Sequence, residues 1–198
     1  FVILGGSGCG KSTLLRNLVG LMRPAAGAIL INGEDFTAMS EDQRTAVRKR
    51  MGMCFQGAAL LNSMSLYDNV ALPLREHTKL KESTIEIMTR IKLDLVGLAG
   101  YEDYQPSELS GGMKQRVCVA VAISLRPKMI IADEPTSALD VVVQRQVMET
   151  IQRLQQELGI SMMLIGHDMG LMAQSVEQLA VMYAGRLAEL AEINTIFE

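Results

Sequence analysis

The residues best suited to chemistry stand at the start of the chain, where Gly5–Ser12 reads Gly-Gly-Ser-Gly-Cys-Gly-Lys-Ser. Gly, four residues and then Gly-Lys-Ser is the spacing of a phosphate-binding loop. The apolar run Phe1–Leu4 precedes it and the helix-compatible run Thr13–Leu21 follows, which gives the loop its strand–loop–helix context. Glycines let successive backbone N–H groups surround an anion, and the following helix directs its positive end there. The pattern therefore favours a phosphate site over a glycine-rich turn with a surface lysine.

Charge and hydroxyl groups have separate expected roles in this loop. Lys11 supplies a mobile cation for the β- and γ-phosphates of a nucleotide, and the Ser12 hydroxyl is suited to hold Mg²⁺. Cys9 stands where a helix N-terminus and Lys11 favour a thiolate, so its alkylation could block nucleotide binding. The simpler interpretation is a small residue tolerated in a loop. The expected nucleotide-binding residues are Gly5, Gly6, Ser7, Gly8, Cys9, Gly10, Lys11, Ser12 and Thr13.

Two adjacent carboxylates follow another apolar run, Met129–Ala132. Asp133, at the end of a strand, is suited to hold Mg²⁺ through its hydration shell, because this ion keeps several waters. Glu134 is then the candidate general base for an attacking water. An ordinary acidic turn is the alternative, which the preceding apolar run disfavours.

A second glycine loop, Leu109–Arg116, resembles the signature motif of ABC-type ATPases. Four further motifs of this family follow the phosphate loop in the family's order. They are similar to the Q-loop (Phe55-Gln56), the Walker B strand with its glutamate (Met129–Pro135), the D-loop (Ser137–Asp140) and the H-switch (Ile165–Asp168). At position 166 the family more often has Thr or Ser, whereas this chain has Gly166. The resemblance covers nearly the whole chain.

The resemblance implies roles for the remaining site residues. Gln56 would contact Mg²⁺ or the attacking water, and His167 would bond to the γ-phosphate, so that Glu134, His167 and Gln56 are the expected catalytic residues. Ser12, Gln56 and Asp133 are the expected ligands of Mg²⁺, the implied cofactor. The signature residues would act in trans, on the nucleotide held by a second subunit, with Asp140 near the joint. These signature residues are Ser110, Gly111, Gly112 and Gln115.

The family also implies partners, namely a second copy or a paralogous ATPase subunit and transmembrane permease subunits. It further implies that this chain is a peripheral subunit at the cytoplasmic face of the inner membrane. No apolar run approaches the about 18 residues that cross a bilayer. The net charge of −3, with no basic stripe, argues against a nucleic-acid partner. Three scattered cysteines without Cys-x-x-Cys spacing indicate reduced thiols and no zinc site.

Strand and helix patterns indicate an α/β fold. The runs Phe1–Leu4, Met129–Ala132 and Met162–Ile165 suit strands buried on both faces of a parallel sheet. Between the last two, Val143–Leu158 has apolar residues on one helical face, and Gly159 follows as a stop. The 198 residues fit one domain.

Smaller units are expected around this core. Ala28–Gly33 and Arg50–Phe55 are predicted to form a second, antiparallel sheet, and Ser83 with Glu86 resembles the capping box of a helix. The predicted fold is a P-loop NTPase core with a parallel sheet, a small antiparallel β subdomain and an inserted α-helical subdomain. The core and β subdomain take residues 1–66 and 126–198 of the single domain 1–198, and the helical subdomain takes residues 67–125. The family normally has a strand pair upstream of Phe1 that carries an aromatic residue stacking on adenine. This residue is absent here, where the termini look cut, and whether that region was cut away or never existed stays open.

The cargo and class of function stay open at this point. Residues 69–78 resemble ATPases of phospholipid-trafficking systems, whereas 138–144 and 181–186 resemble peptide and nickel importer ATPases, which we favour because the match is longer. A soluble ATPase acting on DNA or ribosomes is disfavoured, because no coiled coil and no second cassette is present. A regulatory cassette without hydrolysis is disfavoured by intact Lys11, Asp133, Glu134 and His167.

Overall fold

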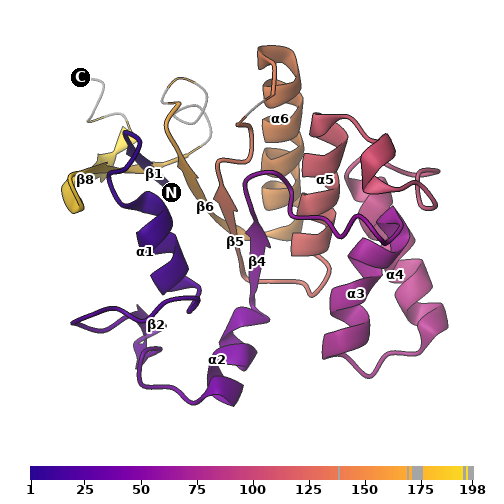
Figure 1. Ribbon diagram of the computed structural model, residues 1–198, viewed down its shortest axis with the longest axis horizontal. Coiled ribbons are helices and arrows are strands. Elements are labelled where there is room, and N and C mark those ends of the chain that lie inside the picture. Colours follow the sequence, from indigo (N-terminus) through magenta and orange to yellow (C-terminus); the bar gives the residue numbers. More distant parts are fainter. Residues whose placement is uncertain (138, 169, 171–175, 194, 196–198) are drawn as a thin grey trace.

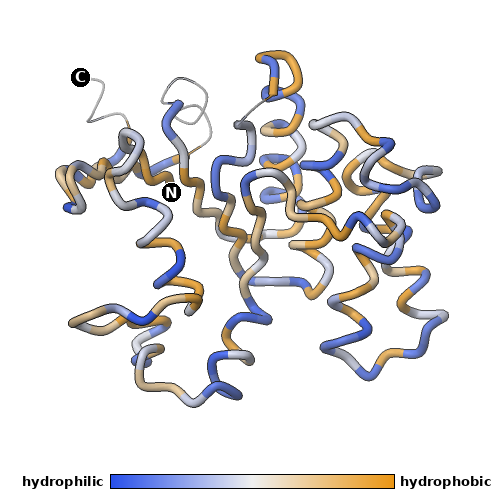
Figure 2. The backbone as a smooth tube through the Cα atoms, in the orientation of Figure 1, coloured by the Kyte–Doolittle hydropathy of each residue, from blue (hydrophilic) through white to orange (hydrophobic). Residues whose placement is uncertain are grey.

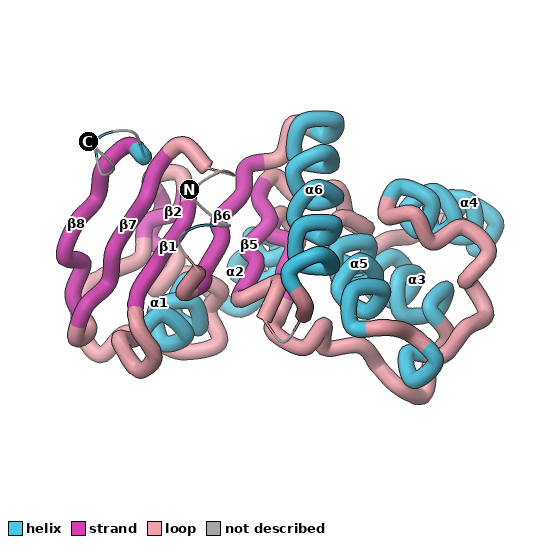
Figure 3. The backbone as a smooth tube through the Cα atoms, turned by 90° about the horizontal axis from the view of Figure 1, so that it is seen from above, coloured by secondary structure: helices cyan, strands magenta, loops and turns pink. Residues whose placement is uncertain are grey.

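A six-stranded sheet forms the centre of the protein in the computed structural model, which describes residues 1–137, 139–168, 170, 176–193 and 195. All neighbouring strands are parallel except β7 and β8. Figure 3 shows β8, β7, β1, β6 and β5 side by side in this order. In sheet order the strands are β4 (Met51–Cys54), β5 (Met129–Asp133), β6 (Ser161–Gly166), β1 (Val2–Gly5), β7 (Gln178–Tyr183) and β8 (Arg186–Glu192).

The strand register places the predicted chemical residues at one edge of this sheet. Leu4 lies opposite Gly166, and Asp133 lies opposite Ile165. The carboxyl ends of β1, β5 and β6 therefore coincide, at the upper edge of the sheet in Figure 1. Ligands of open α/β sheets bind outside this edge, so the register alone brings the phosphate loop, Glu134 and His167 close to one another.

Helices cover both faces of the sheet because alternate strand residues point to opposite sides. The helices are α1 (Lys11–Leu18), α2 (Glu41–Arg48), α3 (Leu66–His77), α4 (Glu82–Leu95), α5 (Gly111–Ala122) and α6 (Val141–Leu158), with a 3₁₀ turn at Pro106–Glu108. One buried cluster joins Val2, Leu4 and Leu164 to Val147, Ile151 and Leu154 of α6. A second joins Ile3, Ile131 and Ile165 to Leu15 of α1 and to Val19, the C-cap residue of this helix. The strand residues carry mostly hydrophobic colours in Figure 2.

Helices α3, α4 and α5 pack beside the sheet, as the right-hand part of Figure 1 shows. Ser65 caps α3 by accepting a hydrogen bond from the Asp68 N–H, and Ser110 caps α5 in the same way from Met113. The predicted capping box at Ser83 was wrong, because α4 begins at Glu82 and Lys81 is its N-cap residue. No described helix is long and apolar enough to span a membrane.

The small antiparallel sheet is confirmed, but one of its predicted strands was wrong. It consists of β2 (Leu30–Ile31) and β3 (Glu34–Asp35). The segment Arg50–Phe55 instead supplies β4 to the main sheet, parallel to β5. Gly52 lets this strand lie directly against α5, because a Cβ there would lie 2.5 Å from the Ala122 carbonyl oxygen. This close approach covers Gly52 and Cys54 of β4, whereas Met51 and Met53 stay partly exposed.

Candidate nucleotide-binding site

A cavity of about 690 Å³ opens above the phosphate loop at the carboxyl edge of the sheet. It brings together residues from the ends of β1, β4, β5 and β6 that are far apart in the sequence. Its lining consists of Gly6, Ser7, Gly8, Gly10, Lys11, Ser12, Thr13, Gln56, Glu134 and His167. Gly5 ends β1 just below the loop, and Cys9 is buried beneath it. The volume and polar lining suit a nucleotide, because ligand sites of this kind measure about 300–1,000 Å³.

The loop conformation requires glycine at two positions. Gly8 and Gly10 have φ angles of 79° and 105°, in the left-handed region where a Cβ is strained. Gly10 is the N-cap of α1, so the free N–H groups of this helix face the cavity. A helix N-terminus of this kind is a binding site for anions. The β7–β8 turn supports the loop from outside, since the Gly185 N–H donates to the Cys9 carbonyl oxygen at 3.0 Å.

Lys11 is held against the loop with only 7% of its surface exposed. Its Nζ donates to the carbonyl oxygens of Gly5 at 2.7 Å and Gly6 at 3.0 Å, and lies 3.9 Å from the Cys9 Sγ. An ammonium group has three N–H donors. Two bond to the loop carbonyls and the third makes only a long contact with the weakly accepting Cys9 sulfur, so the ammonium group can turn it to a phosphate oxygen in the cavity that Lys11 lines.

The three expected catalytic side chains meet at the Glu134 carboxylate. The Gln56 Nε2 donates to Glu134 Oε2 at 3.3 Å, and the His167 Nδ1 lies 3.3 Å from Glu134 Oε1. Each carboxylate oxygen therefore has one polar neighbour, from the ends of β4 and β6 respectively. Glu134 is mostly buried, whereas 63% of the His167 side chain is exposed. A carboxylate fixed from both sides beside a phosphate cradle can accept a proton from a water in the cavity.

The backbone of Glu134 is in an unfavourable conformation. Its φ angle is 46°, which costs a residue with a side chain about 1–3 kcal/mol. Its N–H donates to the Ile165 carbonyl oxygen at 2.8 Å. Its own carbonyl oxygen accepts from the Ser137 N–H at 3.1 Å and from the Ser137 Oγ at 3.0 Å. These bonds turn the chain sharply after β5 and direct Glu134 toward the cavity.

Asp133 ends β5 and is half-buried, at the edge of the cavity but not among its lining residues. Burial raises the pKa of its carboxyl group, and the neighbouring Glu134 carboxylate raises it further, against the opposing charges of Lys11 and Arg16. A bound cation would relieve both effects. The hydroxyl of Ser12, the carboxylate of Asp133 and the amide of Gln56 provide the oxygen donors that Mg²⁺ prefers.

Few protein ligands surround this position. Within the described residues, no group of three or more His, Cys, Asp or Glu side chains could hold a metal ion. Mg²⁺ is usually held by one or two carboxylates together with phosphate oxygens and water. The donor set at Ser12, Asp133 and Gln56 fits Mg²⁺ bound with a nucleotide better than a metal held by protein alone.

The signature residues do not belong to the cavity of their own chain. Ser110 caps α5, and the two glycines let the first turn of this helix approach its neighbours. A Cβ at Gly111 would meet Leu139, and one at Gly112 would meet Val143, both within 3.0 Å. Gln115 is 5% exposed, and its Nε2 has no hydrogen-bond partner among the described residues. The expectation that these residues act on another copy stays a prediction.

Asp140 has a local structural role that its expected D-loop role did not include. It caps α6, because its Oδ1 accepts from the backbone N–H groups of Val142 at 3.1 Å and Val143 at 3.0 Å. Ala138, in the middle of the same motif, lies outside the described residues. The amino-acid pattern alone gives no sign of the Ser137 hydroxyl bond or of the support from Gly185, since both contacts depend on the fold.

The parallel sheet and the phosphate loop place this chain among the nucleotide-binding α/β proteins. Comparison with known proteins narrows the class: the chain belongs to the ABC transporter family, whose sequence profile matches residues 1–137.

Individual relatives agree with this membership. The chain is 41% identical over 197 residues to a methionine import ATP-binding protein, MetN 1, of Burkholderia pseudomallei, covering 100% of this chain and 57% of that protein. The chain thus spans little more than half the length of the curated relatives it matches. CbiO1 of Clostridium perfringens, described as part of the ABC transporter complex cbiONQ, has a TM-score of 0.90 at 31% identity, covering 99% of this chain and 78% of that one. A dimeric cassette, MJ0796, bound to ADP and Pi has a TM-score of 0.86 at 28% identity, covering 97% and 84%.

Proposed function

We propose that this chain binds and hydrolyses ATP to power an ABC importer. The observation that carries the proposal is the Glu134 carboxylate, held between Gln56 and His167 beside the phosphate loop. The curated relatives are named for methionine import. An amino-acid importer is therefore closer to the comparisons than the peptide-type importer that we favoured from the sequence. The phospholipid class has no support from the relatives cited.

Each residue of the cavity has a part in the proposed reaction. The loop N–H groups and Lys11 would bind the β- and γ-phosphates, while Ser12, Asp133 and Gln56 would hold Mg²⁺. This ion supplies charge that stabilises the transferred phosphoryl group. Glu134, which Gln56 and His167 hold in place, accepts a proton from the attacking water. Gln56 and His167 also line the cavity in which the terminal phosphate would lie. If a second subunit closed over this cavity and excluded water from it, these electrostatic interactions would become stronger.

The signature loop is the proposed contribution of a second subunit, another copy or a paralogue. Ser110, with the free N–H groups at the start of α5, offers a second anion site that the cavity of its own chain does not use. The solved relative MJ0796 is described as dimeric. In a head-to-tail pair, each Ser110 loop would cover the γ-phosphate held by the Lys11 loop of the other subunit, and Asp140 would lie near the joint. ADP lacks this phosphate, so hydrolysis would release the pair.

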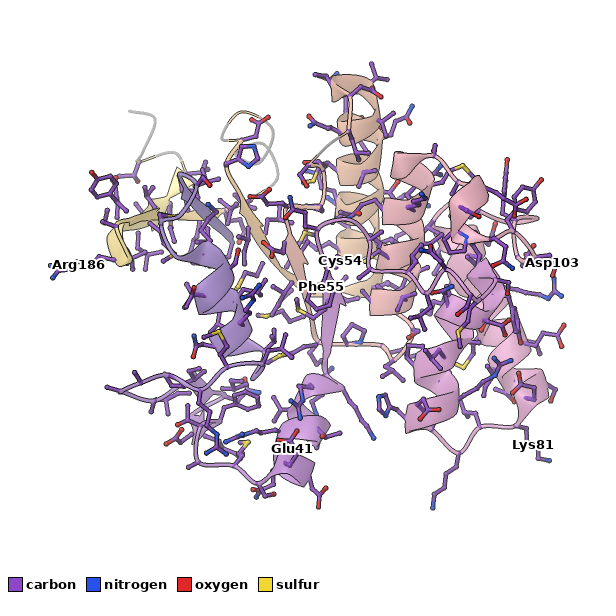
Figure 4. All side chains as sticks on the ribbon, viewed as in Figure 1. Glu41, Cys54, Phe55, Lys81, Asp103 and Arg186 are labelled. Carbon is purple, nitrogen blue, oxygen red and sulfur yellow. The ribbon has the colours of Figure 1, made fainter. Side chains whose placement is uncertain are left out.

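A groove of about 440 Å³ is the proposed docking site for a permease at the membrane. It lies between α2, β4, α3 and α5, with Met51, Met53 and Phe55 in its apolar part. Figure 4 places Cys54 and Phe55 at the end of β4, beside the helices. Because β4 leads directly into Gln56, a partner seated in the groove would sense the state of the nucleotide site through this strand.

Replacement of Glu134 tests the proposed hydrolysis. Glu134→Gln removes the base but keeps the shape of the side chain, so ATP binding should persist while turnover falls by about 10²–10⁴-fold. Glu76→Gln, an exposed residue of α3 outside the cavity, is the matched control and should behave as the unchanged protein. Phosphate release with Mg²⁺ and ATP measures turnover, and calorimetry measures binding. Hydrolysis at the normal rate in Glu134→Gln would show that Glu134 is not the base.

A further inference from the structure

The geometry points to Ser137 as a positioning residue that holds Glu134 in the conformation needed to accept a proton. This inference rests on the proposed role of Glu134 as the base. Ser137 does not line the nucleotide cavity. It acts on the reaction only through the backbone of Glu134, three residues earlier in the chain.

The first observation is how the turn after β5 is held. Glu134 has a left-handed φ angle of 46°, which a glutamate does not adopt without support. Its carbonyl oxygen accepts two hydrogen bonds from the same residue, one from the Ser137 N–H at 3.1 Å and one from the Ser137 Oγ at 3.0 Å. The hydroxyl thus adds a second restraint at the position where the peptide plane after Glu134 would otherwise rotate.

The second observation is a tie from α6 to the same turn. The Gln144 Nε2 donates to the Thr136 carbonyl oxygen at 3.1 Å, and Thr136 is 4% exposed. The backbone next to Ser137 is therefore held in place, since the preceding residue is bonded to the long helix α6. The chain from Glu134 to Ser137 forms a short closed turn anchored at both ends.

The third observation is the space behind the turn. A cavity of about 120 Å³, separate from the nucleotide cavity but sharing Glu134 and His167 with it, is lined also by Thr136, Ser137, Gln144, Gly166 and Asp168. Close packing therefore does not confine this side of the turn, and a peptide plane that loses a hydrogen bond has room to move. Because packing does not hold the turn on this side, the Ser137 hydroxyl bond determines the direction of the Glu134 side chain.

Two substitutions at Ser137 test the inference. Ser137→Ala removes the hydroxyl, and Ser137→Thr keeps it and adds a methyl group for which the cavity has room. We expect Ser137→Ala to lower kcat for ATP by about tenfold, or about 1.4 kcal/mol of barrier, with the ATP dissociation constant unchanged. Ser137→Thr should restore most of kcat. The matched control is Ser40→Ala, which removes a serine hydroxyl that caps α2, far from the nucleotide cavity.

The outcomes separate positioning from simple stabilisation. The inference is supported if kcat falls in Ser137→Ala while Tm falls no more than in Ser40→Ala. It is overturned if kcat stays within twofold of the unchanged protein, if the threonine fails to rescue, or if the loss appears in ATP binding instead of kcat. If Glu134→Gln hydrolyses ATP normally, the proposed function fails. If Glu134→Gln is inactive but Ser137→Ala is fully active, only the positioning role fails.

Discussion

Replacing Gly112 with alanine tests how the signature helix packs on its neighbour. Gly112 lies in the first turn of α5, where an added Cβ would come within 3.0 Å of Val143 Cγ1 on α6. Overpacking of this kind costs about 1–3 kcal/mol, and alanine regains up to about 1 kcal/mol over glycine in a helix. We expect Gly112→Ala to lower the free energy of unfolding by about 1 kcal/mol.

A second substitution makes this prediction specific. Val143→Ala removes the atoms that the new Cβ would meet, at a cost of about 1 kcal/mol for methyl groups taken from a partly buried site. In the double variant the clash is gone and the helical preference of alanine remains. The double variant should therefore be at least as stable as Val143→Ala alone, a coupling of about 1–2 kcal/mol.

Urea unfolding followed by far-ultraviolet circular dichroism measures these free energies, since the chain contains no tryptophan. Gly52→Ala provides the contrast, because its Cβ would meet the backbone oxygen of Ala122, which no side-chain replacement removes. Val143→Ala should leave the cost of Gly52→Ala unchanged. Additive costs for Gly112→Ala and Val143→Ala would refute the packing that the structure shows.

Two further predictions concern charge and pH. The Arg75 guanidinium bonds to Asp68 at 2.9 Å and to Glu82, and these hydrogen bonds lower the pKa of both carboxyl groups. Carboxyl groups with lowered pKa values stabilise the fold at neutral pH, and this stabilisation is lost as pH falls through those values. Arg75→Gln should therefore show a small deficit in Tm at pH 7 that disappears in acid. An equal deficit at low pH would count against this ion pair. Asp133 has a raised pKa, so its charged form is unfavourable in the ligand-free fold and the stability of the unchanged protein declines as pH rises through that pKa. Asp133→Asn should raise Tm at pH 7, and this gain should vanish in acid. The same change should weaken the stabilisation that Mg²⁺ with ATP provides. A lower Tm at pH 7 would contradict an unfavourable buried charge at Asp133.

The grouping of most candidate-site residues around one cavity could be predicted, because these residues follow strands. The loop after Phe1–Leu4, the carboxylates after Met129–Ala132 and His167 after Met162–Ile165 all stand where parallel strands end. Parallel strands end at one edge of a sheet, so sequence order was enough to expect their proximity. The expected proximity of these residues did not depend on how the side chains of the core pack.

Features that depend on distant contacts were not predictable in this way. Arg50–Phe55 has the local pattern of a strand but gives no sign of its sheet, which depends on pairing with β5, far along the chain. Ser83 resembled a helix cap, but the helix begins one residue before it. The hydrogen bond from the Ser137 hydroxyl to the Glu134 carbonyl oxygen depends on the left-handed φ angle of Glu134, and no local sequence pattern predicts this angle.

The molecular mass of Glu134→Gln in solution tests the central claim, that one nucleotide is held between two chains, most directly. Light scattering with Mg²⁺ and ATP should give twice the mass of one chain, because in the proposed pair each signature loop would bind the γ-phosphate held by the other copy. ADP should leave single chains, and Ser110→Arg should prevent pairing without loss of ATP binding. A single-chain mass with ATP bound at saturation, or equal pairing with ADP, would contradict the account.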